Sequence, residues 1–429
     1  MGGGLAGLGA GLTAPTPLVI VEALARPGGL TLTDSMKGFH FDKTGHIIHL
    51  RRPVEKRLIR GVLRGLLTKR KRKAAFYMRG KLLPYPFQTH FLLLGEPLAS
   101  RCLEDFKKAR KRWPKGGVNK DFEAWCRTQF GDGIAEAFML PYNEKLFRIA
   151  PKKMNPSWRG VYIPRPSMAE VMKAKREGEL SGQGYNAVFS YPKKGGIEAL
   201  PRGLAKMAGK RPGLRLLTGR RVRRIDLAKK RVALDSGKTL GWERLISTLP
   251  LPETLKLCGK VPSAIRAAAS RLRWVGVVNV NLGFKGNPWP GIHWVYFSEK
   301  KYPFYRIGFP SRFSNGAAPR GTTSCYVEVS YRPEDGPDVK KAEREVLASM
   351  RDLGLLAEKQ KLMVLRSQVI PYAYVVFDHH RAQAVRVIHE WLAGKGVVCA
   401  GRYGEWTYGS MEDALASGRE AGIRLSSLR

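Results

Sequence analysis

The sequence has few cysteines and no long apolar run, and both scarcities limit the class of protein. Its five cysteines are odd in number and scattered, and no two have C-x-x-C spacing; they are Cys102, Cys126, Cys258, Cys325 and Cys399. Such a set favours reduced thiols over a disulfide framework or a zinc site. The longest apolar runs fall short of the roughly 18 residues of a membrane-spanning helix. With no basic signal-peptide region at the start, we expect a cytoplasmic protein.

Acidic residues are also scarce relative to basic ones. Asp and Glu total 35 against 76 Lys and Arg, a formal net charge of +41. This excess predicts attraction to anions, which include phosphorylated small molecules, anionic membrane surfaces and nucleic acid. No series of stacking aromatic residues accompanies the charge, which argues against nucleic acid as the main partner.

The densest basic stretch spans residues 51–73. Apolar residues between its charges can form one face of an amphipathic helix; they are Leu58, Ile59, Val62, Leu63, Leu66 and Leu67. Two interpretations are open. One is a peripheral contact with an anionic membrane. The other, which we favour, is an arginine-rich helix whose charged face is solvated.

What the sequence does contain is a glycine fingerprint at its start. Gly2, Gly4 and Gly7 form G-x-G-x-x-G, and the apolar run 18–21 leads to Glu22. In a strand–turn–helix unit these glycines allow a tight turn, backbone approach to a pyrophosphate and close packing of helix on strand. The acid at the end of the next strand binds ribose hydroxyls. The pattern therefore predicts a dinucleotide cofactor.

One part of this unit is absent from the sequence. A β-strand should precede the fingerprint, but only Met1 stands there. Because that strand is central in a doubly wound sheet, we expect the first strand to be missing. Either the natural chain begins upstream of Met1, or a truncated chain survives with a damaged nucleotide site. Pro15 and Pro17 should end the first helix early.

The remainder of the chain alternates between helical and strand-rich stretches. Residues 75–180 are largely helical in pattern, 214–249 predict a small β-meander, and 272–335 predict an antiparallel sheet. A second strand–glycine–helix pattern occupies 396–421. The two ends of the chain are therefore expected to build one nucleotide-binding domain that other lobes interrupt. His46 and His49 lack a nearby third ligand, so no metal site is predicted.

Four longer segments carry a more specific pattern. They are PYPFQ at 84–88, GDGIAEAFMLPYNEKLFRIAPKKM at 131–154, VYFSEKKYPFYR at 295–306 and GRYGEWTYGSMEDA at 401–414. In order and spacing they resemble the FAD-binding amine oxidase and protoporphyrinogen oxidase superfamily. Within it they are most similar to UDP-galactopyranose mutases, especially the eukaryotic type. The resemblance runs nearly from end to end.

The resemblance implies an α/β fold with a discontinuous, Rossmann-like FAD-binding domain, whose first strand is missing here. This domain would be built from residues 1–74, 181–265 and 376–429. A helical lobe at 75–180 and an antiparallel-sheet substrate lobe at 266–375 would separate its three parts.

The resemblance also implies which residues form the site. FAD-binding positions are matched by Gly2, Gly4, Gly7, Glu22, Arg26, Gly28, Gly29, Gly45, Val222, Gly401, Arg402 and Met411. The sugar-nucleotide pocket of the mutases is matched by Tyr85, Gln88, Asn143, Trp158, Arg306 and Tyr408. His46, Arg306 and Tyr408 are expected to take the catalytic roles. No metal is implied.

This sequence departs from the mutases at two places. They carry an arginine just after the tryptophan that Trp158 matches, whereas alignment puts Tyr162 there, with Arg159 and Arg165 only as neighbours. The segment after Tyr408 is shorter than in the eukaryotic mutases and lacks their Asn-Gln-Asp-His stretch. A diphosphate needs convergent cations, and Arg306 is the clear one.

Three functions therefore remain open. We favour a FAD-dependent oxidoreductase of unknown substrate. The first alternative is a UDP-sugar mutase that uses reduced flavin as nucleophile, and the second is a cofactor-less basic binding protein.

Overall fold

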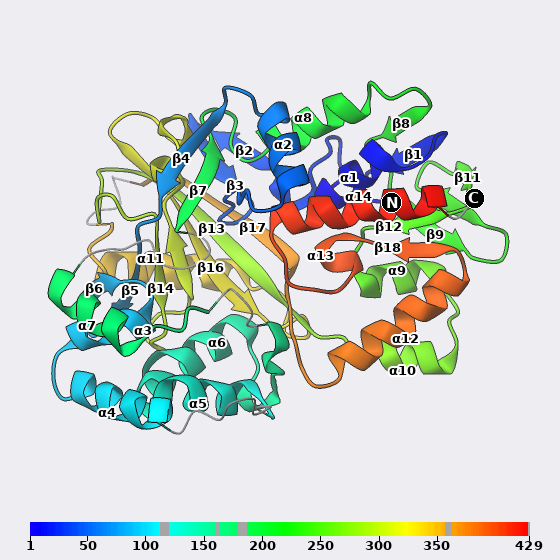
Figure 1. The fold of residues 1–429 in the computed structure, drawn as a ribbon. Coiled ribbons are helices and arrows are strands. Elements are labelled where there is room, and N and C mark those ends of the chain that lie inside the picture. The colour runs from blue at the N-terminus through cyan, green and yellow to red at the C-terminus, as the bar shows by residue number, and fades with distance from the viewer. Residues whose placement is uncertain (112–119, 159–162, 179–186, 357–361, 428–429) are drawn as a thin grey trace.

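The computed structural model describes residues 1–111, 120–158, 163–178, 187–356 and 362–427. The chain forms a mixed α/β structure in which the first and last helices lie side by side (Figure 1). A large sheet lies on the other side of the molecule, and a group of helices lies below that sheet (Figure 1). None of the described helices combines the length and apolar content that a membrane crossing requires.

Two pairs of parallel strands and two helices bring both ends of the chain together. Helix α1 spans Leu5–Thr13 and α14 spans Met411–Ser427. Strand β1 (Leu18–Val21) pairs with β8 (Leu214–Leu217), and β12 (Leu245–Ser247) pairs with β18 (Val397–Cys399). Segments from distant parts of the sequence thus lie side by side, and the two ends of the chain meet here.

Met1 and Gly2 lie between these two strand pairs. The amino group of Met1 donates to Ile246 O at 2.6 Å, and Thr248 N donates to Met1 O at 3.0 Å. On the other side, Gly2 N donates to Val21 O at 2.8 Å. These bonds join β1 to β12, although residues 1–4 contain no strand of their own. That a strand belongs before the fingerprint stays a prediction.

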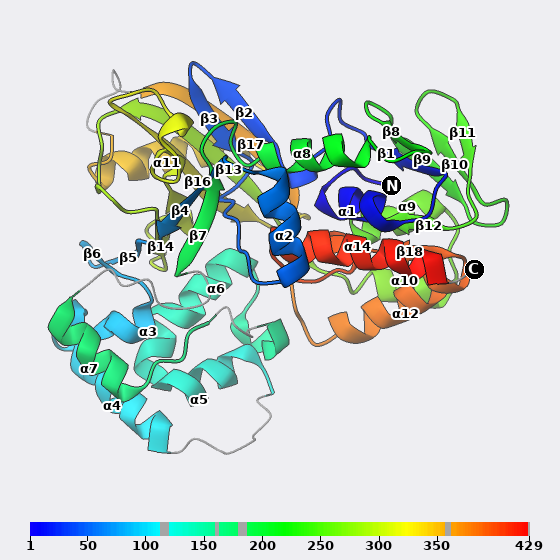
Figure 2. The ribbon, with the colours of Figure 1, turned by 45° about the horizontal axis from the view of Figure 1, so that its top comes forward.

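Helices α1 and α14 approach so closely that glycine is required between them. A Cβ at Gly418 would lie 1.9 Å from Ala6 O, and one at Gly9 would lie 2.5 Å from Leu415 O. Helix α1 ends at Thr13, before the prolines, as expected. This contact, seen again in Figure 2, fixes where the N-terminus of α1 points.

A seven-stranded sheet forms the second half of the molecule, in the order β17-β13-β16-β15-β14-β5-β6. Its strands are β5 (Ala74–Met78), β6 (Lys81–Pro84), β13 (Trp274–Lys285), β14 (Trp294–Phe297), β15 (Arg306–Gly308), β16 (Thr322–Tyr331) and β17 (Leu362–Val375). The strands predicted within residues 272–335 pair with one another antiparallel, as expected, and the whole sheet is mixed because β5, from outside that stretch, pairs with β14 in parallel. Residues 74–84, expected at the edge of the helical lobe, add two strands to this sheet. Local alternation cannot indicate a partner two hundred residues away.

The helical lobe packs an aromatic core against this sheet. Its helices are α3 (Phe87–His90), α4 (Leu98–Lys111), α5 (Phe122–Ile134), α6 (Leu140–Phe147) and α7 (Met168–Glu177). Lys145 on α6 reaches across to the loop after β14. Its ammonium group donates to the carbonyl oxygens of Glu299 at 2.5 Å, Tyr302 at 2.9 Å and Phe304 at 3.4 Å. This one side chain therefore connects the lobe to the sheet.

The basic stretch 51–73 is only partly helical. Helix α2 spans Pro53–Val62, and β4 (Leu67–Lys71) pairs with β7 (Val188–Pro192), so Leu66 and Leu67 lie off the helix. Ile59 and Leu63 are each 1% exposed, which places the apolar face of α2 in the core. The basic residues on the outer face of α2 are exposed, and the choice between solvent and an anionic membrane at that face stays a prediction.

The remaining α-helices and strands complete the fold. They are β2 (Thr33–Met36), β3 (Phe39–Asp42), α8 (Ala199–Ala208), β9 (Val222–Asp226), β10 (Arg231–Leu234), β11 (Thr239–Gly241), α9 (Leu251–Cys258), α10 (Ser263–Ala269), α11 (Val339–Asp352), α12 (Arg381–Gly394) and α13 (Gly401–Gly404). The predicted meander is present as β9-β10-β11, while β8 and β12 join other sheets. All five cysteines are free thiols. We retain the five-segment domain division as a proposal.

Gly418→Ala should destabilise the protein by about 1–3 kcal/mol, because the added methyl group collides with the backbone of α1. Gly61→Ala is the matched control. It lies in α2 with open space around it, and should stabilise by about 0.5 kcal/mol through helix propensity. Urea unfolding checks both. Equal effects would contradict the packing argument.

Lys145→Met should lower the free energy of unfolding by about 2 kcal/mol, since three carbonyl groups lose their hydrogen-bond donor. Lys152→Met, at an exposed position, serves as control and should change it by less than about 0.5 kcal/mol. Thermal unfolding at equal protein concentration makes the comparison. A variant at position 145 as stable as wild type would show that the ammonium contacts contribute nothing.

Candidate functional site

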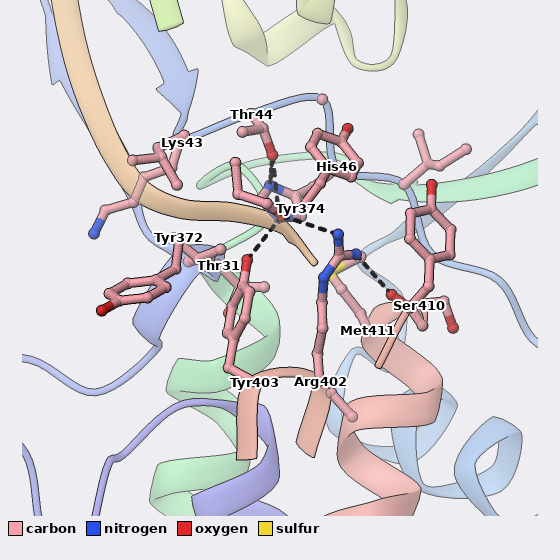
Figure 3. A pocket seen from close by; sticks show the side chains of 18 of the residues that line it. Thr31, Lys43, Thr44, His46, Tyr372, Tyr374, Arg402, Tyr403, Ser410 and Met411 are labelled. Atoms are coloured by element: carbon pink, nitrogen blue, oxygen red, sulfur yellow. Dashed lines mark hydrogen bonds between the residues drawn. The ribbon is translucent and has the colours of Figure 1, made fainter. Parts of the chain in front are cut away.

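A cavity of about 610 Å³ lies where the two ends of the chain, the helical lobe and the large sheet meet. Its walls come from the N-terminus of α1, the loop after β3, the helical lobe, the ends of the large sheet, and the segment from α13 to α14. Figure 3 shows Lys43, Thr44 and His46 on the loop above, with Arg402 and Tyr403 reaching up from below.

Glycines form one end of the cavity. Gly4 precedes the first turn of α1, and no side chain caps that helix. Gly29, with φ of +59°, comes so close that a Cβ on it would lie 3.3 Å from Gly4 Cα. Gly7 packs behind this end, where a Cβ would lie 1.8 Å from Gly2 O. A helix N-terminus opening into a glycine-lined wall fits a diphosphate group, because its N–H groups and dipole favour negative charge.

Glu22 stands at this glycine end and is 7% exposed. Its carboxylate accepts hydrogen bonds from Gly3 N at 2.7 Å and Leu24 N at 2.8 Å. These bonds hold both oxygens in place and leave further lone pairs on each. The group is therefore suited to accept hydrogen bonds from hydroxyl groups of a bound ligand.

The loop that carries His46 lies directly against the large sheet. A Cβ at Gly45 would lie 2.0 Å from the hydroxyl oxygen of Tyr326, so only glycine permits this approach. Burial, with the charges of Arg402 and Arg306, lowers the pKa of His46 to about 4. The imidazole is therefore neutral near pH 7.

Arg402 lies among aromatic rings at the other wall of the cavity. It donates to Gly409 O and Ala373 O, each at 3.0 Å, and its guanidinium carbon lies 4.8 Å from the ring centroid of Tyr408. Burial and the neighbouring Tyr374 raise the pKa of Tyr408 to about 12, with Arg402 acting against them. Tyr408 thus keeps its proton and can donate a hydrogen bond.

Arg306 forms a bidentate ion pair with Glu328 on the neighbouring strand. Nε lies 2.5 Å from Oε2 and Nη2 lies 2.8 Å from Oε1, and Glu328 is 0% exposed. Glu328 was not predicted from the sequence. A single acid inside the buried strand of residues 322–331 was the available signal, since a buried carboxylate requires a partner.

The remaining predicted substrate residues form the wall nearest the helical lobe. Gln88 donates to Pro164 O at 2.8 Å and Asn143 donates to Met139 O at 2.7 Å, so both amides are oriented by backbone. The rings of Trp158 and Tyr408 have centroids 6.1 Å apart. Arg72, which was not predicted from the sequence, lies over Tyr85. Its guanidinium carbon is 5.0 Å from the centroid of the Tyr85 ring.

The cavity contains most of the residues that the sequence singled out. They are Gly2, Gly4, Glu22, Gly28, Gly29, Gly45, His46, Tyr85, Gln88, Asn143, Trp158, Arg306, Gly401, Arg402, Tyr408 and Met411.

Three predicted cofactor residues stand away from the cavity wall. Gly7 packs behind it, Val222 lies in a hydrophobic core, and Arg26 pairs with Asp34 at 3.2 Å and Glu198 at 3.4 Å. That Arg26 contacts the cofactor stays a prediction, although its guanidinium is paired with these two carboxylates. Arg159 and Tyr162 lie outside the described residues.

The chain was compared with protein families and solved structures. The family described as flavin containing amine oxidoreductase matches residues 7–422. A crystal structure of reduced UDP-galactopyranose mutase shares 25% identity and a TM-score of 0.90, covering 100% of this chain and 93% of that one.

Two further structures are similar in fold alone. A protein from Exiguobacterium sp. 255-15 assigned as a protoporphyrinogen oxidase has 15% identity and a TM-score of 0.74, with 100% and 98% of the two chains covered. A putrescine oxidase bound to putrescine has 15% identity and a TM-score of 0.61, covering 99% and 98%.

His46→Gln should make the protein less sensitive to acid. Because the folded-state pKa of His46 is near 4 and the ordinary value is 6.5, the unfolded state binds more protons between these values, and wild-type stability falls as pH drops through this window. The variant should lose up to about 3 kcal/mol less between pH 7 and pH 4. His379→Gln, at an exposed residue, should behave as wild type. Urea unfolding across pH tests this, and parallel curves for all three proteins would refute it.

Proposed function

This chain belongs to the flavin-containing amine oxidoreductase family, and on that premise we propose that it acts on an anionic small molecule, with a sugar nucleotide as the best candidate. It is a flavin-dependent enzyme, and FAD is its cofactor. The finer proposal concerns the substrate and the residues that bind it.

The observation that carries the proposal is the charge of the cavity wall. Among the described residues that line it, Arg72 and Arg306 are the cations on the substrate side, Lys43 and Arg402 stand on the cofactor side, and Glu22, the one acid, belongs to the glycine end. Such a wall attracts anions and disfavours a protonated amine. The similarity to UDP-galactopyranose mutase, at 25% identity over the whole chain, supports a sugar nucleotide in particular.

In this proposal the glycine end of the cavity holds the cofactor. Gly2, Gly4, Gly28 and Gly29 would present backbone to its diphosphate, and Glu22 would bind ribose hydroxyls. Bound FAD supplies the ring at which bonds of the substrate are made and broken. Gly45, His46, Gly401, Arg402 and Met411 would surround that ring.

The substrate would lie between the ring and the helical lobe. Arg306 would bind a phosphate oxygen, and Tyr85 and Tyr408 would donate hydrogen bonds to it, since both phenols are protonated. Gln88 and Asn143 would contact the sugar, and Trp158 offers a flat face for it. Neutral His46 would accept or donate a hydrogen bond without adding charge.

A second candidate is net oxidation of an anionic substrate. Glu328 pairs with Arg306 through both oxygens, which weakens the grip of Arg306 on a diphosphate. A substrate with fewer negative charges would then suffice. The cofactor-less binding protein, by contrast, is set aside because the family is one of flavin enzymes.

The reaction can be tested with purified protein that shows the two absorbance bands of oxidised flavin. UDP-galactopyranose is incubated with oxidised and with dithionite-reduced protein, and products are separated by chromatography. We expect an isomer of equal mass only after reduction. Oxygen consumption with an anionic substrate would favour the second candidate, and turnover confined to amines would contradict both.

Substitutions at the ion pair separate binding from folding. Glu328→Gln frees the charge of Arg306 and should tighten UDP binding several-fold. The double variant Arg306→Met, Glu328→Gln leaves no lone buried charge and should weaken UDP binding about 10- to 100-fold. Calorimetric titration measures both. Unchanged affinity in the double variant would exclude Arg306 from the phosphate site.

A further inference from the structure

Lys43 is a cation in the cavity wall that the sequence analysis did not select. It follows β3 on the loop that carries His46, and it lines the cavity. Within the described residues its ammonium group forms no ion pair or hydrogen bond. Burial lowers its pKa, with the Asp34 and Glu22 carboxylates acting against this. A partly buried ammonium group without a partner is costly unless a ligand anion supplies one.

The side chain belongs to the glycine end of the cavity. Figure 3 shows Lys43 extending to the side opposite His46 and Arg402. Glu22, which acts on its charge, stands at the same end as Gly4 and Gly29. The positive charge of Lys43 therefore adds to that of the uncapped N-terminus of α1.

The arginine expected at this end is engaged elsewhere. Arg26 lies outside the cavity wall and pairs with Asp34 and Glu198. Its side chain is half exposed, at 50%. Among the described residues that line the cavity, Lys43 is the cation at the glycine end, because Arg72, Arg306 and Arg402 belong to the other walls.

We infer that Lys43 binds the diphosphate of FAD, taking the place predicted for Arg26. An ammonium group and a phosphate oxygen form a charge-assisted hydrogen bond, and a helix N-terminus completes the same anion site. The inference concerns the cofactor end and does not depend on which substrate the enzyme uses.

The experiment measures cofactor affinity, not turnover. Release of FAD from the purified holoprotein is followed by the rise in flavin fluorescence on dilution. Flavin-depleted protein is then titrated with ADP, which carries the diphosphate, and with riboflavin, which does not. The variants are Lys43→Gln, Lys43→Arg and Arg26→Gln, and Lys37→Gln is the matched control, at an exposed lysine of the same β2–β3 hairpin.

Lys43→Gln should weaken the binding of FAD and ADP about 10- to 100-fold and leave the affinity for riboflavin within about twofold of wild type. Lys43→Arg should restore most of the affinity, and Lys37→Gln should match wild type. The inference is overturned if Lys43→Gln stays within about twofold of wild type for ADP, if it weakens riboflavin equally, if Arg26→Gln causes the larger loss, or if wild-type protein binds neither FAD nor ADP.

Discussion

The contact between α1 and α14 is the constraint on which the rest of the structure depends. Gly418 allows the last helix to lie on the backbone of the first one, at Ala6. Helix α1 is only nine residues long, and its packing against α14 fixes the direction of its axis. Its N-terminus consequently points into the cavity, beside the start of α14. One close approach of backbones thus places two ends of the chain around a single ligand site.

The large sheet contributes the charged and polar residues of the opposite cavity wall. The large sheet brings Arg306 and Glu328 onto adjacent strands in direct register, and the His46 loop lies against the same sheet through Gly45. The helical lobe closes this wall and is tied to the sheet through Lys145. A positively charged cavity with a neutral imidazole follows from this assembly. This charge supports the proposal of an anionic substrate over a protonated amine.

The basic residues of the chain lie in two different environments. Most of it is on the surface, for example on the outer face of α2, where solvent screens each charge. A small part faces the cavity, where screening is weaker and each charge counts for more. The net charge of +41 therefore does not indicate the charge of the site, which depends on four cationic residues of the cavity wall.

The sequence alone determined the features that depend on near neighbours in the chain. The glycine fingerprint, Glu22 after an apolar run and the short first helix are of this kind, because turn, cap and periodicity signals act over a few residues. Resemblance in four segments added the family and most of the cavity residues. Only the tertiary structure decided which charges line the cavity. Arg26 turns outward to Asp34, Lys43 turns inward, and Glu328 meets Arg306, because these outcomes depend on partners that pairing and packing bring together from distant parts of the chain.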